Sequence, residues 1–112
     1  MHSRFIRHKF RAKSVTDDGQ HFPSQLEHAY YRKLKLDVAA GNVLFFLRQV
    51  PFHMAGGVKY VCDFVEFRTD GTVRFIDVKG VETAEFIMKK KMVEATFPIE
   101  IEVVKKNDFR CA

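Results

Sequence analysis

The sequence lacks long hydrophobic runs, acidic residues near its start, and a cysteine framework. Its longest apolar run, from Val43 to Leu47, is far shorter than the ~20 apolar residues of a membrane-spanning helix. The first residues contain no apolar segment of the signal-peptide type. Cys62 and Cys111 form no Cys-x-x-Cys motif, which argues against a disulfide framework. We therefore expect a cytoplasmic protein without a membrane partner, in which Cys62 is a buried strand residue.

No acidic residue occurs before Ser14, whereas five basic residues do, and they account for the whole net charge of +5. From Ser14 onward, 14 basic residues balance 14 acidic ones. A basic arm is typical of proteins that bind a polyanion, because neutralising phosphates releases counterions. A solvated terminal tail is the alternative. The arm residues that we assign to nucleic-acid binding are Arg4, Arg7, Lys9, Arg11 and Lys13.

The rest of the composition is that of a folded domain. Apolar residues make up 46% of the chain, which includes 12 Phe, and a disordered chain is rarely so apolar. Its 112 residues suffice for one hydrophobic core. We therefore divide the chain into a basic arm, residues 1–13, and a single domain, residues 14–112.

Hydrophobic periodicity predicts two helices and four strands. Ser24 followed by Glu27 is a capping-box signature, and it opens a helix whose apolar positions recur at helical spacing and whose face with Tyr31 points to water. In the second helix, Ala84, Ile87, Met88, Met92 and Ala95 form the expected inner stripe. The predicted helices are residues 24–40 and 83–96, and the predicted strands are residues 43–50, 58–68, 72–79 and 99–103.

The loop Thr69-Asp70-Gly71 sets the register of the central hairpin. Both a two-residue turn and a three-residue loop with a left-handed Gly suit this sequence, and they pair different residues. The three-residue loop places Glu66 opposite Arg74 and aligns apolar residues along the rest of both strands. These favourable pairs support the three-residue loop.

The same register places Asp63 opposite Asp77, with Lys79 on the same face. Cβ atoms of directly opposed residues are about 4.5 to 5.5 Å apart, where two carboxylates repel each other. A divalent cation relieves that repulsion, and Mg²⁺ prefers oxygen ligands. Asp63, Asp77 and the Val78 carbonyl are therefore candidate metal ligands, and Lys79 is expected beside the metal. The alternative is that both carboxylates lie near solvent at strand ends and that Lys79 balances them.

The ordered motifs resemble the PD-(D/E)xK nuclease superfamily. They include Asp63, then Asp77-Val78-Lys79-Gly80, preceded by Ser24-x-x-Glu27 and Gln49-Val50-Pro51-Phe52. This string is similar to small phage-encoded endonucleases related to Holliday-junction resolvases, and to the nuclease subunit of heteromeric transposases. Cys62 replaces the Pro that normally precedes the first Asp. The resemblance covers about residues 21 to 106.

This resemblance implies a restriction-endonuclease-like α/β fold, with a mixed sheet of four or five strands flanked by helices. It implies that Asp63 and Asp77 are metal ligands, that Lys79 is the catalytic lysine, and that Glu27 completes the site. For Glu27 a capping box is the alternative. Gln49 matches the strand-end Gln of the family, but we leave it outside the catalytic set because a loop hydrogen bond explains it equally well.

The implied activity is that of a DNA endonuclease that requires Mg²⁺, with Mn²⁺ as a substitute, and that selects branched DNA. A phage or prophage origin and a homodimer follow from the same resemblance. Lys89, Lys90 and Lys91 extend the predicted DNA surface, although a solvated helix face is the alternative. The competing functions are a non-catalytic DNA-binding module on a vestigial nuclease fold and a regulatory phage protein.

Overall fold

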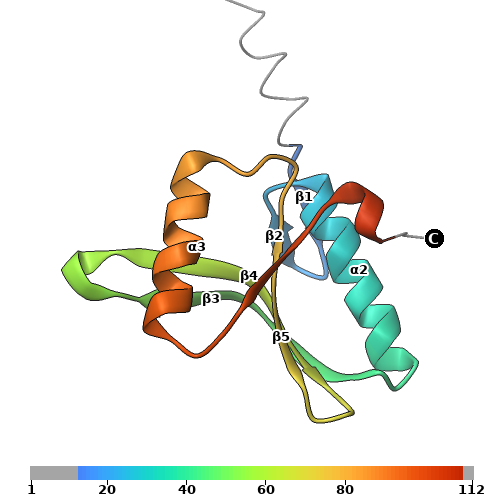
Figure 1. The fold of residues 1–112 in the computed structure, drawn as a ribbon. Coiled ribbons are helices and arrows are strands. Elements are labelled where there is room, and N and C mark those ends of the chain that lie inside the picture. Colours follow the sequence, from blue (N-terminus) through green and yellow to red (C-terminus); the bar gives the residue numbers. More distant parts are fainter. Residues whose placement is uncertain (1–12, 110–112) are drawn as a thin grey trace, which may run out of the picture.

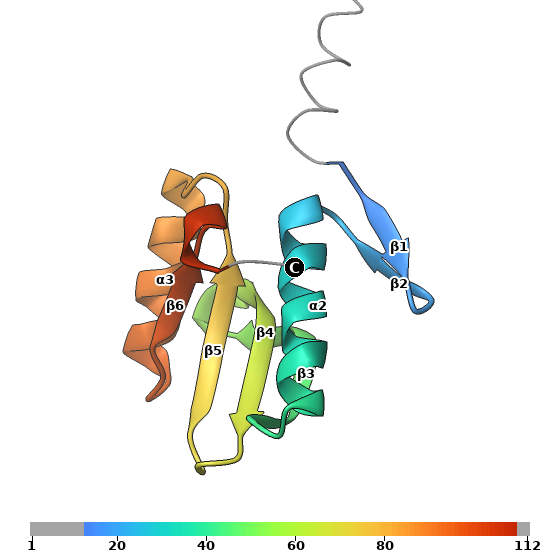
Figure 2. The same cartoon turned by 90° about the vertical axis from the view of Figure 1, so that its right-hand side faces the viewer.

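A four-stranded sheet with one helix on each face forms the centre of the structure, a computed structural model that describes residues 13–109 (Figure 1). Figure 2 shows α2 and α3 on opposite sides of this sheet. The strand order is β3-β4-β5-β6, antiparallel except for the parallel pair β5 and β6. The bounds are β3 (Val43–His53), β4 (Lys59–Arg68), β5 (Val73–Val78), β6 (Ile101–Val104), α2 (Gln25–Ala39) and α3 (Ala84–Thr96). The expected mixed α/β architecture is confirmed.

Helix α2 begins after its predicted cap, Ser24, and ends shortly before Gly41. The Ser24 hydroxyl accepts a hydrogen bond from the Glu27 amide at 3.1 Å. Gly41 follows the helix with a φ of +84°, a conformation that glycine adopts without steric cost. The prediction that Tyr31 faces water is wrong, because the rings of Phe22 and Phe46 pack against it.

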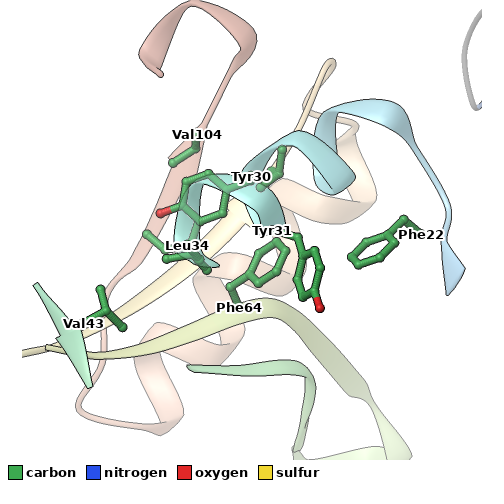
Figure 3. Packing of buried hydrophobic residues seen from close by; sticks show 9 residues of the cluster. Phe22, Tyr30, Tyr31, Leu34, Val43, Phe64 and Val104 are labelled. Atoms are coloured by element: carbon green, nitrogen blue, oxygen red, sulfur yellow. The ribbon is translucent and has the colours of Figure 1, made fainter. Parts of the chain in front are cut away.

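The core between α2 and the sheet is rich in aromatic side chains (Figure 3). Tyr30 and Phe64 are in ring contact at 5.2 Å, and Leu34 beside them is fully buried. Phe22 reaches this cluster from a small hairpin that was not among the predicted strands. That hairpin consists of β1 (Val15–Asp17) and β2 (Gln20–Phe22), joined by Asp18 and Gly19 with positive φ angles.

The central hairpin has the predicted register. Glu66 pairs with Arg74, and Phe67 pairs with Val73, as the three-residue loop requires. Gly71 has a φ of +89°, and the Arg68 amide donates to the Thr72 carbonyl across the loop at 2.9 Å. The loop and the apolar pairs therefore fix which residues meet at the other end of β4 and β5.

Strand β3 is longer than predicted and partly exposed. It continues through Pro51 to His53, although the sequence predicted that the strand ends at residue 50. Because β3 lies at the edge of the sheet, the missing amide of Pro51 removes no necessary ladder hydrogen bond. The side chains of Leu44, Phe45 and Leu47 are 63%, 50% and 46% exposed, although this stretch is the longest apolar run of the chain.

Helix α3 presents a different face to the sheet from the one predicted. Phe86 and Val93 are its buried residues, whereas Ile87 and Met88 of the expected inner stripe are exposed. The Thr83 hydroxyl caps the helix as expected, accepting from the Phe86 amide at 3.2 Å. The 3-10 turns η1 (Ala55–Gly57) and η2 (Lys106–Asp108) complete the fold. No helix among residues 13–109 is long and apolar enough to cross a membrane.

Candidate functional site

The predicted carboxylates meet where β4 and β5 separate. The ladder between these strands ends at Phe64 and Ile76, one step before the expected pair of Asp63 and Asp77. Beyond this last pair, a side chain takes the place of a backbone carbonyl as hydrogen-bond acceptor. Oδ2 of Asp63 accepts a hydrogen bond from the Val78 amide at 2.9 Å. The amide and carbonyl of a strand residue point to the same neighbouring strand, so the Val78 carbonyl also faces this gap.

Asp77 is almost completely buried, with 1% of its surface exposed. Its Oδ2 accepts a hydrogen bond from the Tyr60 hydroxyl, whereas its Oδ1 has no donor among residues 13–109. Burial, followed by the neighbouring carboxyl of Asp63, raises the pKa of Asp77 to about 8. A buried carboxylate oxygen without a donor is unfavourable, so the site has an unmet requirement for a positive charge or a proton.

Gln49 connects two of the predicted acidic residues. Its Nε2 donates to Glu27 Oε2 at 2.8 Å and to Asp63 Oδ1 at 3.4 Å. Gln49 has a φ of +53°, an uncommon conformation for a residue with a side chain in a strand. Such outliers occur often at functional sites, where the surrounding structure enforces them.

The distortion at Gln49 coincides with a change of face along β4. Phe64 packs in the core under α2, whereas Cys62 and Tyr60 pack in the second core under α3. A regular strand would keep these three side chains on one face. The change of face brings Tyr60 to the side of the sheet where its hydroxyl reaches Asp77.

Glu27 faces the site and does not complete the capping box through its side chain. Its buried carboxylate accepts from Gln49 and forms an ion pair with Arg48, whose Nη2 lies 3.0 Å away. Burial, and then the negative charge of Asp63, raises the pKa of Glu27. The charge of Asp63 therefore acts on Glu27 from within the same cluster, with Arg48 as the compensating cation.

Lys79 lies beside the carboxylates without pairing directly with them. Its ammonium group is 4.6 Å from the centroid of the Phe86 ring, a cation–π contact. The positive charge of Lys79 acts on Asp77, lowering its pKa against the larger effects that raise it. This is the position expected for a charge that stabilises a bound phosphate next to the carboxylates.

The residues at the gap fit a magnesium ion that keeps most of its water ligands. Within the described ranges, no three His, Cys, Asp or Glu side chains converge to hold a metal. Mg²⁺ does not require such a group, because it commonly uses one or two carboxylates with several waters. Asp77 Oδ1 offers the buried oxygen without a donor, and Asp63 and the Val78 carbonyl border the same gap.

The predicted basic residues have different environments. Lys89 and Lys90 are half-buried and pair with Glu85 and Glu94 at 3.2 and 3.1 Å, whereas Lys91 is exposed. Lys13 is exposed ahead of β1. The remaining arm residues lie outside the described residues; they are Arg4, Arg7, Lys9 and Arg11.

Three residues that contact the predicted site residues were not themselves predicted to belong to the site. Gln49 had been left outside the set, although a polar side chain at the end of an otherwise apolar run was a usable signal. Arg48 and Tyr60 had no assigned role, and their partners come from distant parts of the sequence. Only the tertiary arrangement of α2, β3, β4 and β5 brings these side chains together.

Comparison with known protein families matches most of the chain to one family profile. A protein-family profile described as "Protein of unknown function (DUF1064)" matches residues 7–109. A search of curated proteins finds no match. The matched range includes Glu27, Gln49, Asp63, Asp77 and Lys79.

Proposed function

The chain belongs to the DUF1064 family, and we propose that it is a metal-dependent DNA endonuclease that hydrolyses phosphodiester bonds. The observation that carries this proposal is the buried Asp77 Oδ1, which lacks a hydrogen-bond donor among residues 13–109. It lies next to a second carboxylate and a lysine at the point where two strands separate. This combination supports a site for a divalent cation and a phosphate.

Each side chain at the gap has a distinct task in this proposal. Asp77 and Asp63 hold the cation, and the Val78 amide together with Gln49 orients the Asp63 carboxylate. Tyr60 orients Asp77, and because burial followed by the charge of Asp77 raises the pKa of Tyr60, its hydroxyl keeps the proton that it donates. Lys79 stabilises the negative charge that develops on the phosphate during attack by water. When bound there, Mg²⁺ would supply polarisation of the phosphate and a more acidic water as the attacking group.

Glu27 acts through its neighbours in this scheme. Its ion pair with Arg48 leaves its carboxylate engaged, and its hydrogen bond with Gln49 links it to Asp63. We therefore assign Glu27 to positioning Gln49, and with it Asp63, with water between Glu27 and the cation. This refines the expectation that Glu27 completes the site directly or through water.

The wider features of the proposal follow the resemblance found in the sequence. They are a preference for branched DNA, action in the cytoplasm of a host cell, and a homodimer that presents two sites to two strands. A second candidate is a non-catalytic DNA-binding protein on the same fold, and the engagement of Glu27 by Arg48 favours it, since fewer carboxylates are then free for a cation.

Cleavage assays separate the two candidates. Purified protein is incubated with supercoiled, linear, single-stranded and four-way-junction DNA in Mg²⁺, Mn²⁺ or EDTA. The nuclease proposal predicts cutting with either metal and none in EDTA. Asp77→Asn and Lys79→Ala are expected to lower the rate by roughly 100-fold or more while DNA binding persists.

Matched controls come from an ion pair on the outer part of α2. Lys33 and Asp37 pair at 2.7 Å away from the gap, so Asp37→Asn and Lys33→Ala are expected to cut at the wild-type rate. If no DNA is cut with either metal, or if Asp77→Asn cuts as fast as Asp37→Asn, the nuclease proposal is wrong.

A further inference from the structure

An open pocket of about 340 Å³ adjoins the candidate site on the side of Lys79. Its lining residues come from the start of β4, the end of β5 and the first turns of α3, elements that are far apart in the sequence. Two of its lining residues had been assigned from sequence, Lys79 to the catalytic site and Lys89 to the DNA surface, whereas Lys59 and Glu85 had no assigned role. The lining residues are Lys59, Tyr60, Val61, Lys79, Thr83, Glu85, Phe86 and Lys89.

The lining of this pocket is strongly positive. Lys59, Lys79 and Lys89 contribute three ammonium groups against the single carboxylate of Glu85. Lys59 and Lys79 form no ion pair within residues 13–109, so both charges are available to a ligand. Lys89 pairs with Glu85 at 3.2 Å, and that glutamate side chain is 72% exposed. An incoming anion therefore competes with Glu85 for Lys89.

The pocket suits a phosphate group better than a nucleobase. The rings of Tyr60 and Phe86 are only 3% and 7% exposed, so no aromatic face is free for a base to stack on. The pocket also borders the first turn of α3, where the helix dipole favours negative charge. Lysine ammonium groups bind phosphate as point charges without a strict geometry.

We propose that this pocket binds a backbone phosphate of the DNA strand next to the scissile phosphodiester. The inference rests on the proposed nuclease function, because Lys79 belongs both to the site and to the pocket wall. One strand then passes from the gap at Asp77 across Lys79 to Lys59 and Lys89. Of the three consecutive lysines on α3, Lys89 alone lines this path.

Binding measurements on the full chain in EDTA test this inference without any cleavage. The probe is a fluorescent DNA duplex with hydroxyl ends, followed by anisotropy over a range of salt concentrations. Lys59→Ala and Lys89→Ala are each expected to weaken binding about 3- to 10-fold and to reduce the slope of log K against log salt by about 1. Lys33→Ala is the matched control, because Lys33 forms an ion pair of the same i,i+4 spacing with Asp37 on α2, on the opposite side of the sheet from α3 (Figure 2). It is expected to change affinity less than about twofold.

Glu85→Gln provides a test of opposite sign. Because Glu85 competes with phosphate for Lys89, its neutralisation is expected to tighten binding. Equal effects of Lys59→Ala, Lys89→Ala and Lys33→Ala would overturn the inference, as would weaker binding by Glu85→Gln. Effects that occur only with a 5′-phosphorylated duplex would also overturn it, since they would indicate a pocket for a terminal phosphate.

These outcomes are separate from those of the cleavage assay. A protein that shows the predicted pattern of binding but cuts no DNA contradicts the nuclease proposal and not the presence of a phosphate pocket. A protein that cuts DNA with metal while its pocket variants bind like Lys33→Ala retains the nuclease function and has no phosphate site here.

Discussion

Asp77 combines near-complete burial with a close carboxylate neighbour, and both conditions oppose its ionisation. Asp63 is half-buried, and the Val78 amide and the Gln49 side chain donate hydrogen bonds to it. The sequence predicted that Asp63 and Asp77 meet, since the hairpin register depends on local turn chemistry and pairing. It did not predict the bond from Val78 to Asp63 or the backbone of Gln49, because both depend on the separation of β4 from β5.

The stability of the metal-free protein is expected to fall as pH rises. In the folded state the pKa of Asp77 is about 8, whereas an unperturbed Asp has a pKa of 3.8. Between these values the folded protein holds a proton that the unfolded chain releases, so a higher pH favours unfolding. Asp77→Asn removes this dependence of stability on pH, because a neutral amide replaces the buried carboxylate.

Thermal unfolding in EDTA between pH 5 and pH 8.5 measures this effect. The Tm advantage of Asp77→Asn over the wild type is expected to grow with each pH unit and to exceed roughly 5 °C at pH 8.5, since one pH unit between the two pKa values is worth about 1.4 kcal/mol and about 1 kcal/mol corresponds to about 4 to 8 °C in a small domain. A constant difference between the two proteins across this range would show that Asp77 ionises normally.

At the scale of elements, local signals were reliable where they act within one hairpin or at one helix end. Ser24 capped α2 and Gly71 closed the hairpin as predicted. Which face of each helix is buried was less predictable, because that depends on which neighbouring elements pack against the helix. In α3 the large ring of Phe86 and the compact Val93 occupy the core, and the stems of Lys89 and Lys90 flank them.

Substitutions on the two faces of α3 test its orientation. Val93 is fully buried and Met88 is 55% exposed. Val93→Ala is expected to lower the free energy of unfolding by about 2 kcal/mol through lost burial and a residual cavity. Met88→Ala is expected to change it by less than about 0.5 kcal/mol. Urea denaturation measures both, and a larger cost for Met88→Ala would support the face predicted from sequence.

At the scale of the whole molecule, the site gathers residues from α2, β3, β4 and β5. Glu27 was predicted to join the two aspartates only through resemblance to a nuclease family, whereas the hairpin register had already placed Lys79 on their face. Periodicity and spacing cannot reveal that Arg48 neutralises Glu27 or that Phe86 contacts Lys79, since each pair comes from elements that meet only in the folded chain. The same holds for the pocket between β4 and α3.

The basic arm is expected to contribute affinity and no chemistry. It carries five basic residues and no acidic ones, whereas the carboxylates of the site all lie in the rest of the chain. Removal of residues 1–13 is therefore expected to weaken DNA binding and to reduce the salt slope by up to about 4, because each neutralised phosphate contributes about 0.9. The turnover rate at saturating DNA is expected to stay unchanged. A truncated protein that binds as tightly as the full chain would identify the arm as a solvated tail.

Calorimetric titration with Mn²⁺ tests most directly whether the gap between β4 and β5 holds a divalent cation. The wild-type protein is expected to bind the metal at pH 8, with affinity falling toward pH 6 as Asp77 retains its proton. Asp77→Asn is expected to lose this binding, whereas Asp37→Asn retains it. Absence of metal binding by the wild type at millimolar Mn²⁺, or equal binding by Asp77→Asn, would contradict the metal site on which the proposed function depends.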